Sequence, residues 1–327
     1  NSYLAGVTVS GYNAAPNLPV YGKDGFYYLN EGGYLGDGAN RSDLYFLNKF
    51  YHPVGTLDLQ RNQNTSQRML GNAYIEVEPV KNLKITSKYG IDYIDNFEDQ
   101  YSDPNIYGLG WKHRYNGLVQ NNNVRRNQWN WSNYASYSLL LADQHNVAAT
   151  AGFEFQEVTF QSIGTYAGNF ADPFFRDIIT GTFVSQFAPE GRSSHNGFDS
   201  FFGRLSYDFG NKYYAEVAMR ADAYSGFGLD NKRGYFPAAS VGWRLSEERF
   251  MDSFDFVDDF KLRASYGIVG NSNIADFASR TLFGGGQYAE LNGLSPTQVG
   301  NTNLKWESST KLDIGFDMAV LQDRIGL

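Results

Sequence analysis

Apolar and polar side chains alternate, position by position, along many segments of this chain. In residues 311–320, KLDIGFDMAV, every second residue from Leu312 is apolar, whereas the other phase carries Lys311, Asp313 and Asp317. The same alternation recurs in residues 83–94, 213–222 and 261–269. A period of two is that of a β-strand whose two faces meet different surroundings. This feature favours an all-β chain and argues against a helical bundle.

The pattern predicts nine strands and the start of a tenth. They cover residues 69–78, 83–94, 125–141, 147–160, 198–208, 213–222, 235–246, 261–269 and 305–320, followed by a strand that begins near Ile325. Aromatic residues make up 17% of the chain and glycine is frequent, with 35 residues, a composition typical of β structure.

The connections between these strands alternate between short and long. Tight turns rich in Asp, Asn, Gly and Pro occupy residues 78–82, 142–146, 208–212 and 321–324. Long segments occupy residues 95–124, 161–197 and 270–304, with 223–234 as the shortest member of the long set and 246–260 as a longer link on the short side. In an up-and-down antiparallel sheet, alternate connections leave from the same edge. Short turns are therefore expected on one rim and long loops on the other.

This asymmetry is typical of an outer-membrane barrel, with short periplasmic turns and long extracellular loops. Strands of about ten residues, tilted near 45°, span the roughly 25 Å apolar band of such a barrel. A soluble sandwich also alternates, but its loops do not sort by length onto two edges. The mean hydropathy of −0.44 does not contradict a barrel, because alternating strands average to a hydrophilic value. The residues predict an up-and-down antiparallel transmembrane β-barrel, present here as a partial barrel of about ten strands.

The alternation also predicts which face meets which solvent. The phase of Leu312, Ile314 and Phe316 should meet lipid, and the phase of Lys311 and Asp313 should face the lumen. Aromatic residues near strand ends are expected to form interfacial girdles, or simply to reflect the preference of rings for strands. They include Trp129, Trp131, Tyr213, Tyr214, Tyr235, Trp243 and Trp306.

No motif indicates catalysis, a metal or a cofactor. The formal charge of −8 argues against a nucleic-acid surface, and the absence of cysteine removes disulfides and thiolate chemistry. The segments SSHNGFDS, FGGGQY and DSFDFVDDF are interpreted as a loop leading into a strand, a flexible loop and a solvated rim turn. The histidines are far apart in the sequence: His52, His113, His145 and His195. We therefore predict that the chain is not an enzyme.

Two long loops combine flat rings with planar hydrogen-bonding groups, a mixture suited to sugar or peptide recognition. The candidate substrate-binding residues are Tyr101, Tyr107, Trp111, Arg114, Tyr115, Phe174, Phe175 and Arg176. The alternative is that these rings only pack the loops against one another.

Three stretches, residues 220–250, 261–274 and 300–325, resemble the barrel region of SusC/RagA-like TonB-dependent outer-membrane transporters. They read RADAYSGFGLDNKRGYFPAASVGWRLSEERF, KLRASYGIVGNSNI and GNTNLKWESSTKLDIGFDMAVLQDRI, and residues 64–92 add a weaker likeness. Ala223, Gly226 and Thr302 depart from the family pattern, in which Gly, Arg and Pro are frequent at these places.

The resemblance implies a piece, residues 1–327, of the barrel domain of an importer for glycans or other oligomeric nutrients in the outer membrane of a Gram-negative, Bacteroidetes-like cell. It implies a plug and a TonB-engaging segment that this chain does not contain, and no cofactor. The implied partners are a SusD-like surface lipoprotein, the TonB complex, outer-membrane lipid and a glycan or peptide substrate, with no nucleic acid. A passive porin or adhesin-like barrel is the alternative, and a barrel enzyme or soluble lectin-like protein is a third reading.

Overall fold

The computed structural model describes residues 20–21, 27, 53–103, 117–172, 174–183, 189–254, 256–288, 291–322 and 324–326. The strands are β1 (Gln60–Val80), β2 (Leu83–Ser102), β3 (Leu118–Leu141), β4 (His145–Gly168), β5 (Thr182–Phe183), β6 (Glu190–Phe209), β7 (Tyr213–Tyr224), β8 (Arg233–Arg244), β9 (Val257–Asn271), β10 (Leu282–Tyr288), β11 (Leu291–Gln298), β12 (Glu307–Val320) and β13 (Ile325–Gly326). The helical elements are short: α2 (Pro53–Leu59), η3 (Ile178–Thr180), η4 (Leu229–Asn231) and η5 (Leu245–Glu247).

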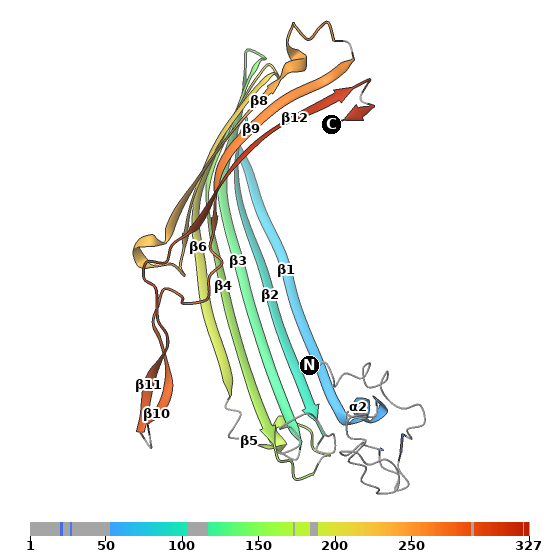
Figure 1. Ribbon diagram of the computed structural model, residues 1–327, viewed down its shortest axis with the longest axis vertical. Coiled ribbons are helices and arrows are strands. Elements are labelled where there is room, and N and C mark those ends of the chain that lie inside the picture. Colours follow the sequence, from blue (N-terminus) through green and yellow to red (C-terminus); the bar gives the residue numbers. More distant parts are fainter. Residues whose placement is uncertain are drawn as a thin grey trace, which may run out of the picture. The chain divides into compact units, whose positions relative to one another are not determined.

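Within the described residues, eleven strands form one sheet in which neighbours follow chain order, β1-β2-β3-β4-β6-β7-β8-β9-β12-β13, with β5 paired to β4 (Figure 1). The pairings along the sheet from β6 to β13 are antiparallel. The all-β, up-and-down antiparallel architecture predicted from the alternation is confirmed. Each predicted strand overlaps an observed one, and no helix in the described part of the chain is long and apolar enough to cross a membrane.

The short turns explain why the strands reverse so tightly at one end. Ala142 and Asp143 both have positive φ, 50° and 54°, and Leu321 and Gln322 have 60° and 61°. Two consecutive left-handed residues form the turns whose twist matches that of the flanking strands. Asn82, with a φ of 69°, closes the β1–β2 turn, and its backbone N–H donates to the Glu78 carboxylate at 2.8 Å.

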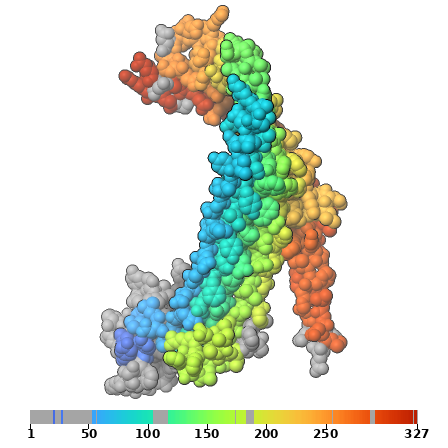
Figure 2. Space-filling model, turned by 180° about the vertical axis from the view of Figure 1, so that it is seen from behind, coloured from blue at the N-terminus to red at the C-terminus, as the bar shows by residue number. Residues whose placement is uncertain are grey.

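The long connection between β9 and β12 holds an unexpected hairpin. Residues 282–288, which contain FGGGQY, form β10 and pair with β11, so the prediction of a flexible loop there was wrong. Gly284, Gly285 and Gly286 lie opposite Ser295, Leu294 and Gly293. Because these glycines have no side chains to pack, the backbone hydrogen bonds hold the two strands together. The β10–β11 hairpin extends away from the ends of β9 and β12 (Figures 1 and 2).

The chain divides into two compact units. Unit 1 comprises residues 1–68, 93–126 and 160–193, and unit 2 comprises residues 69–92, 127–159 and 194–327. In unit 1 a small core forms where Tyr101, Val119 and Phe170 are almost completely buried, with Ile178 packed against them. In unit 2 the sheet itself dominates, and its two faces differ in chemistry.

Candidate functional site

The sheet of unit 2 has one continuous apolar face. Leu205, Val217, Ala239, Tyr266 and Leu312 lie directly opposite one another across β6, β7, β8, β9 and β12, and we call this line the apolar row. Large apolar residues on either side of the row are also exposed. They include Phe201, Met219, Tyr235, Val241, Leu262, Ile314 and Phe316. Ile314 is 79% exposed, which is the opposite of what a water-soluble sheet would arrange.

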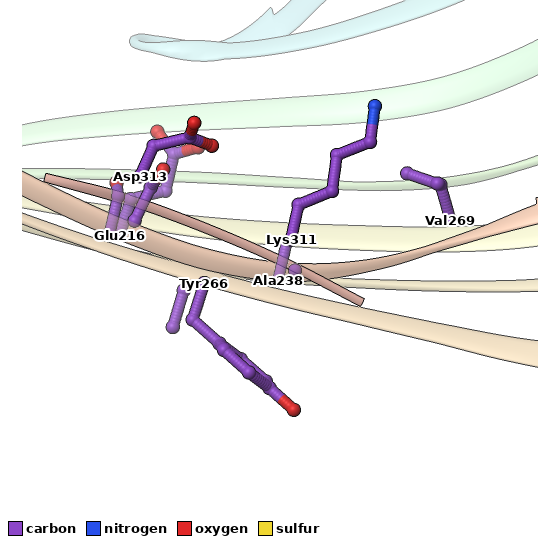
Figure 3. Close-up of a pocket in the computed structure, with 10 residues that line it drawn as sticks. Glu216, Ala238, Tyr266, Val269, Lys311 and Asp313 are labelled. Atoms are coloured by element: carbon purple, nitrogen blue, oxygen red, sulfur yellow. The ribbon is translucent and has the colours of Figure 1, made fainter. Parts of the chain in front are cut away.

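The next residue on each strand points to the other face, which is polar. Ser206, Glu216, Ser240, Ser265 and Asp313 are directly opposite one another across the same five strands, and we call this line the polar row. Figure 3 shows Glu216, Lys311 and Asp313 on one side of the sheet and the Tyr266 ring on the other. The pleat of each strand therefore separates the two chemistries, as the sequence predicted.

Hydrogen bonds and ion pairs hold the polar face together. The Glu216 carboxylate accepts from the Arg204 guanidinium and, at 3.0 Å, from the Ser206 hydroxyl. Arg263 and Asp317 approach to 3.3 Å on neighbouring strands. Ala238 and Gly267 have little or no side chain, so a recess of about 300 Å³ forms at this level beside Glu216 and Asp313.

Aromatic rings lie along the edge of the apolar face at the end of the sheet that carries the short turns, and we call them the aromatic border. The Phe209 ring lies 4.7 Å from His145 and 6.2 Å from Tyr213, which in turn stacks 6.5 Å from Trp243. Glu248, in the link after β8, accepts from the Tyr213 hydroxyl at 2.5 Å, the Lys212 ammonium at 3.0 Å and the Trp243 indole at 3.1 Å. The Tyr213 hydrogen bond, followed by that of Lys212, lowers the pKa of Glu248.

A charged border closes the same face toward the long loops. Arg233 pairs with Asp199 on the strand two places away, and its guanidinium lies 5.4 Å from the Phe201 ring centre. His195 and Glu157 form a second contact of 3.1 Å. Between Phe201 and Phe209, β6 advances about 20 Å along the barrel axis at 3.3 Å per residue and a tilt near 45°. This height is close to the apolar band of a transmembrane barrel, roughly 25 Å.

Above β7 and β8, the loop at residues 225–232 packs against residues 301–306. Phe227 is 2% exposed and lies between Tyr224 and Trp306, at 5.3 Å and 5.2 Å between ring centres. Gly228 donates its N–H to the Leu304 carbonyl, and a side chain at Gly228 would collide with the Thr302 carbonyl. Two of the stretches that carry the family resemblance are thus joined by backbone contact that requires glycine.

The candidate binding residues fall into three groups. Tyr107, Trp111, Arg114 and Tyr115 lie outside the described residues. Tyr101 is 1% exposed, and its ring meets the edge of Phe170 at 6.0 Å and the Arg176 guanidinium at 5.1 Å, so it packs the loop base. Phe174 and Phe175 are exposed and lie edge to face, 5.3 Å apart. A binding role for this set stays a prediction.

The described histidines have neighbours that suit a structural role. His145 shares a 2.8 Å hydrogen bond with the Tyr207 hydroxyl, and His195 contacts Glu157. His52 and His113 lie outside the described residues. In the part of the chain that the structure describes, His, Asp and Glu side chains form no cluster able to hold a metal ion.

Comparison with known proteins assigns the sheet to a family. The family model described as "TonB dependent receptor-like, beta-barrel" matches residues 5–327. The chain belongs to the TonB-dependent receptor β-barrel family. As a member, it is part of a receptor barrel rather than an enzyme, and in such a barrel a face like that of the apolar row meets lipid.

Relatives of this barrel include TonB-dependent receptor P39 of Formosa agariphila, 28% identical over 89% of this chain and 28% of the relative. SusC of Bacteroides thetaiotaomicron is 28% identical over 95% of this chain and 32% of SusC. Among solved structures, the RagAB peptide transporter aligns with a TM-score of 0.77 at 22% identity, covering 93% of this chain and 32% of the solved one. The chain thus spans about three tenths of the length of the relatives that it matches.

Proposed function

We propose that this chain is a section of the barrel wall of a TonB-dependent outer-membrane importer of glycans or other oligomeric nutrients. In this proposal residues 1–327 are one barrel domain, and the plug and TonB-engaging segment belong to other parts of the whole protein. The cell is Gram-negative and Bacteroidetes-like, as are the organisms of the SusC and P39 relatives.

The observation that carries this proposal is the pair of rows on the sheet of unit 2. Five neighbouring strands present Leu205, Val217, Ala239, Tyr266 and Leu312 on one face and five polar residues on the other. Lipid is the solvent that stabilises such a wide exposed apolar face, and a wet lumen suits the opposite face. Together with family membership, this arrangement supports a membrane wall that encloses a polar path.

The proposed partners follow from the relatives. SusC and the RagAB peptide transporter favour pairing with a SusD-like surface lipoprotein. The TonB complex would supply the energy. The substrate is an oligomer, either a glycan or a peptide. The exposed pair Phe174 and Phe175 beside Arg176 remains the proposed contact from the sequence-derived set, since rings and a guanidinium suit either substrate.

Uptake in the native host tests this function. The full-length gene is deleted, and accumulation of fluorescent oligosaccharides and oligopeptides is compared in the deletion strain, the complemented strain and a complemented strain without TonB. We expect uptake only where both the full-length protein and TonB are present. Uptake that persists without TonB would indicate a passive porin, and surface adhesion without uptake would indicate an adhesin-like barrel.

A further inference from the structure

A polar recess in unit 1 lies apart from every residue selected from the sequence. It has a volume of about 250 Å³ and crosses β3, β4 and β6, three neighbouring strands. Its wall carries two primary amides, two hydroxyls, one carboxylate and one guanidinium, and no aliphatic side chain. These groups belong to Gln120, Asn122, Ser162, Tyr166, Glu190 and Arg192.

Glycine creates the space. A Cβ atom at Gly164 would stand 3.9 Å from the Glu190 Cβ and 4.0 Å from the Asn122 Oδ1, which is ordinary van der Waals contact. The floor of the recess is therefore backbone, and the surrounding side chains are close enough for a larger residue at position 164 to fill it. Existing contacts hold the walls in place, because Gln120 Nε2 donates to the Tyr166 hydroxyl at 3.4 Å and Arg192 lies 5.7 Å from the Phe160 ring centre.

The recess lies on one face of its strands. Gln120 and Asn122 share one phase of β3, and Ser162 and Tyr166 share one phase of β4. Asn123 and Arg125, in the other phase of β3, both bond the Asp95 carboxylate on β2, at 2.8 Å and 3.1 Å. The ion-paired surface and the polar recess thus lie on opposite faces of β3.

We propose that this recess is a carbohydrate subsite that holds one neutral sugar residue of a longer glycan. Amide, carboxylate and guanidinium groups each present two polar atoms in a plane, which matches neighbouring hydroxyls on a pyranose ring. The volume is below the roughly 300–1,000 Å³ typical of pockets for drug-sized ligands, so a single ring fits and an oligomer extends out of it. One acid and one base at the recess add no net charge, which favours a neutral ligand over a charged one.

This inference rests on the proposed function, since it names a substrate subsite of the same importer. It differs from that proposal in its residues and its ligand, so the two can fail separately. A peptide ligand is the competing outcome, because amide side chains also bond peptide groups.

The test uses the full-length protein purified in detergent and immobilised arrays of oligosaccharides and oligopeptides. Gly164→Val places a side chain on the floor of the recess, which narrows it, and removes no hydrogen-bonding group. Asn122→Ala and Glu190→Gln remove one donor or acceptor each while leaving the space. Gly203→Val is the matched control, because a Cβ at Gly203 meets only the Thr150 carbonyl, at 3.9 Å, and the residue lies on β6 outside the recess.

We expect the wild-type protein to bind oligosaccharides and Gly164→Val to weaken that binding at least tenfold. Asn122→Ala should weaken it about three- to tenfold and Glu190→Gln about tenfold, the range for one neutral or charged hydrogen bond. Gly203→Val should bind as the wild type does. The difference in gel mobility between heated and unheated samples should show that all four variants are folded.

Two results would overturn the inference. One is a wild-type protein that binds no oligosaccharide or only peptides, and the other is a folded Gly164→Val variant whose glycan affinity is unchanged. TonB-dependent uptake would leave the proposed function standing in either case. Conversely, recess-dependent glycan binding with TonB-independent uptake would sustain the subsite and refute energised import.

Discussion

The apolar and polar rows of unit 2 lie on the same five strands but carry side chains of opposite chemistry. Leu205 and Ser206 are consecutive residues on β6, and the same step separates Leu312 from Asp313 on β12. The side chains of the apolar row offer mainly hydrocarbon surface, whereas Glu216 on the polar face accepts from both Arg204 and Ser206. One face is therefore selected for transfer into hydrocarbon and the other for paired polar groups in water.

The largest expected effect breaks the apolar face. Ile314→Arg in the full-length protein should lower the free energy of unfolding by about 2–4 kcal/mol, because a guanidinium near the bilayer midplane is poorly solvated. Asp313→Asn, the adjacent residue on the polar face, is the matched control and should cost about 0.5 kcal/mol or less. Urea unfolding in lipid vesicles measures both. Equal costs would refute the assignment of the two faces.

A smaller effect tests the polar face. Glu216→Gln weakens the contacts of Arg204 and Ser206, and we expect a loss of at most about 1 kcal/mol because partly exposed ion pairs are screened by water. The loss should shrink as salt is raised, since counterions screen the original pair. Unfolding measured at low and high salt checks this, with Ser240→Ala on the same row as the control. A loss that is independent of salt would mean that the lumen side is dry.

Two phenylalanine substitutions sharpen the contrast by changing shape alone. Phe316→Leu, on a residue that is 54% exposed, should change the free energy of unfolding by about 0.5 kcal/mol or less, because lipid adapts to either side chain. Phe227→Leu, at a site that is 2% exposed between two rings, should cost about 1–1.5 kcal/mol. The same vesicle assay compares them, and similar costs would show that Phe316 packs against protein.

The smallest effect concerns pH at the aromatic border. The folded protein holds the pKa of Glu248 below its ordinary value, so this group contributes stability above its unfolded pKa and loses the contribution as pH falls through the folded pKa. Tyr213→Phe removes the hydroxyl whose hydrogen bond is the largest cause of the lowered pKa of Glu248. The variant should therefore lose less stability than the wild type between neutral and acidic pH, measured by unfolding, because its folded and unfolded pKa values for Glu248 lie closer together. An unchanged acid profile would show that Lys212 and Trp243 suffice to hold the carboxylate.

The sequence predicted the existence of the strands better than their length. The alternation of β2 ends near residue 94, but the strand continues to Ser102, and β4 continues to Gly168 rather than ending at residue 160. Beyond residue 94 of β2, the apolar phase of Ile91 and Tyr93 continues with Asp95, which pairs with Arg125, so the period-two signal fades while the backbone ladder continues. The hairpin β10–β11 was missed for a related reason, because glycine carries no side-chain pattern.

The sequence likewise predicted some of the candidate binding residues and missed others. Residue type alone selected the rings of two loops, and the structure places one of them, Tyr101, in the core and leaves Phe174 and Phe175 exposed. Residue type alone could not select Asn122, Ser162 and Glu190, which are polar residues on three different strands with no shared motif. Only strand pairing brings them to one recess.

The sequence by itself determined the class of fold, the up-and-down order of the main strands and the alternation of apolar and polar side chains in unit 2, because those properties follow from local periodicity and turn chemistry. The tertiary structure decided which residues stand opposite one another. Strand pairing sets the polar row and the recess at Gly164, and loop packing sets the contact of Gly228 with Leu304; both depend on contacts between segments far apart in the chain.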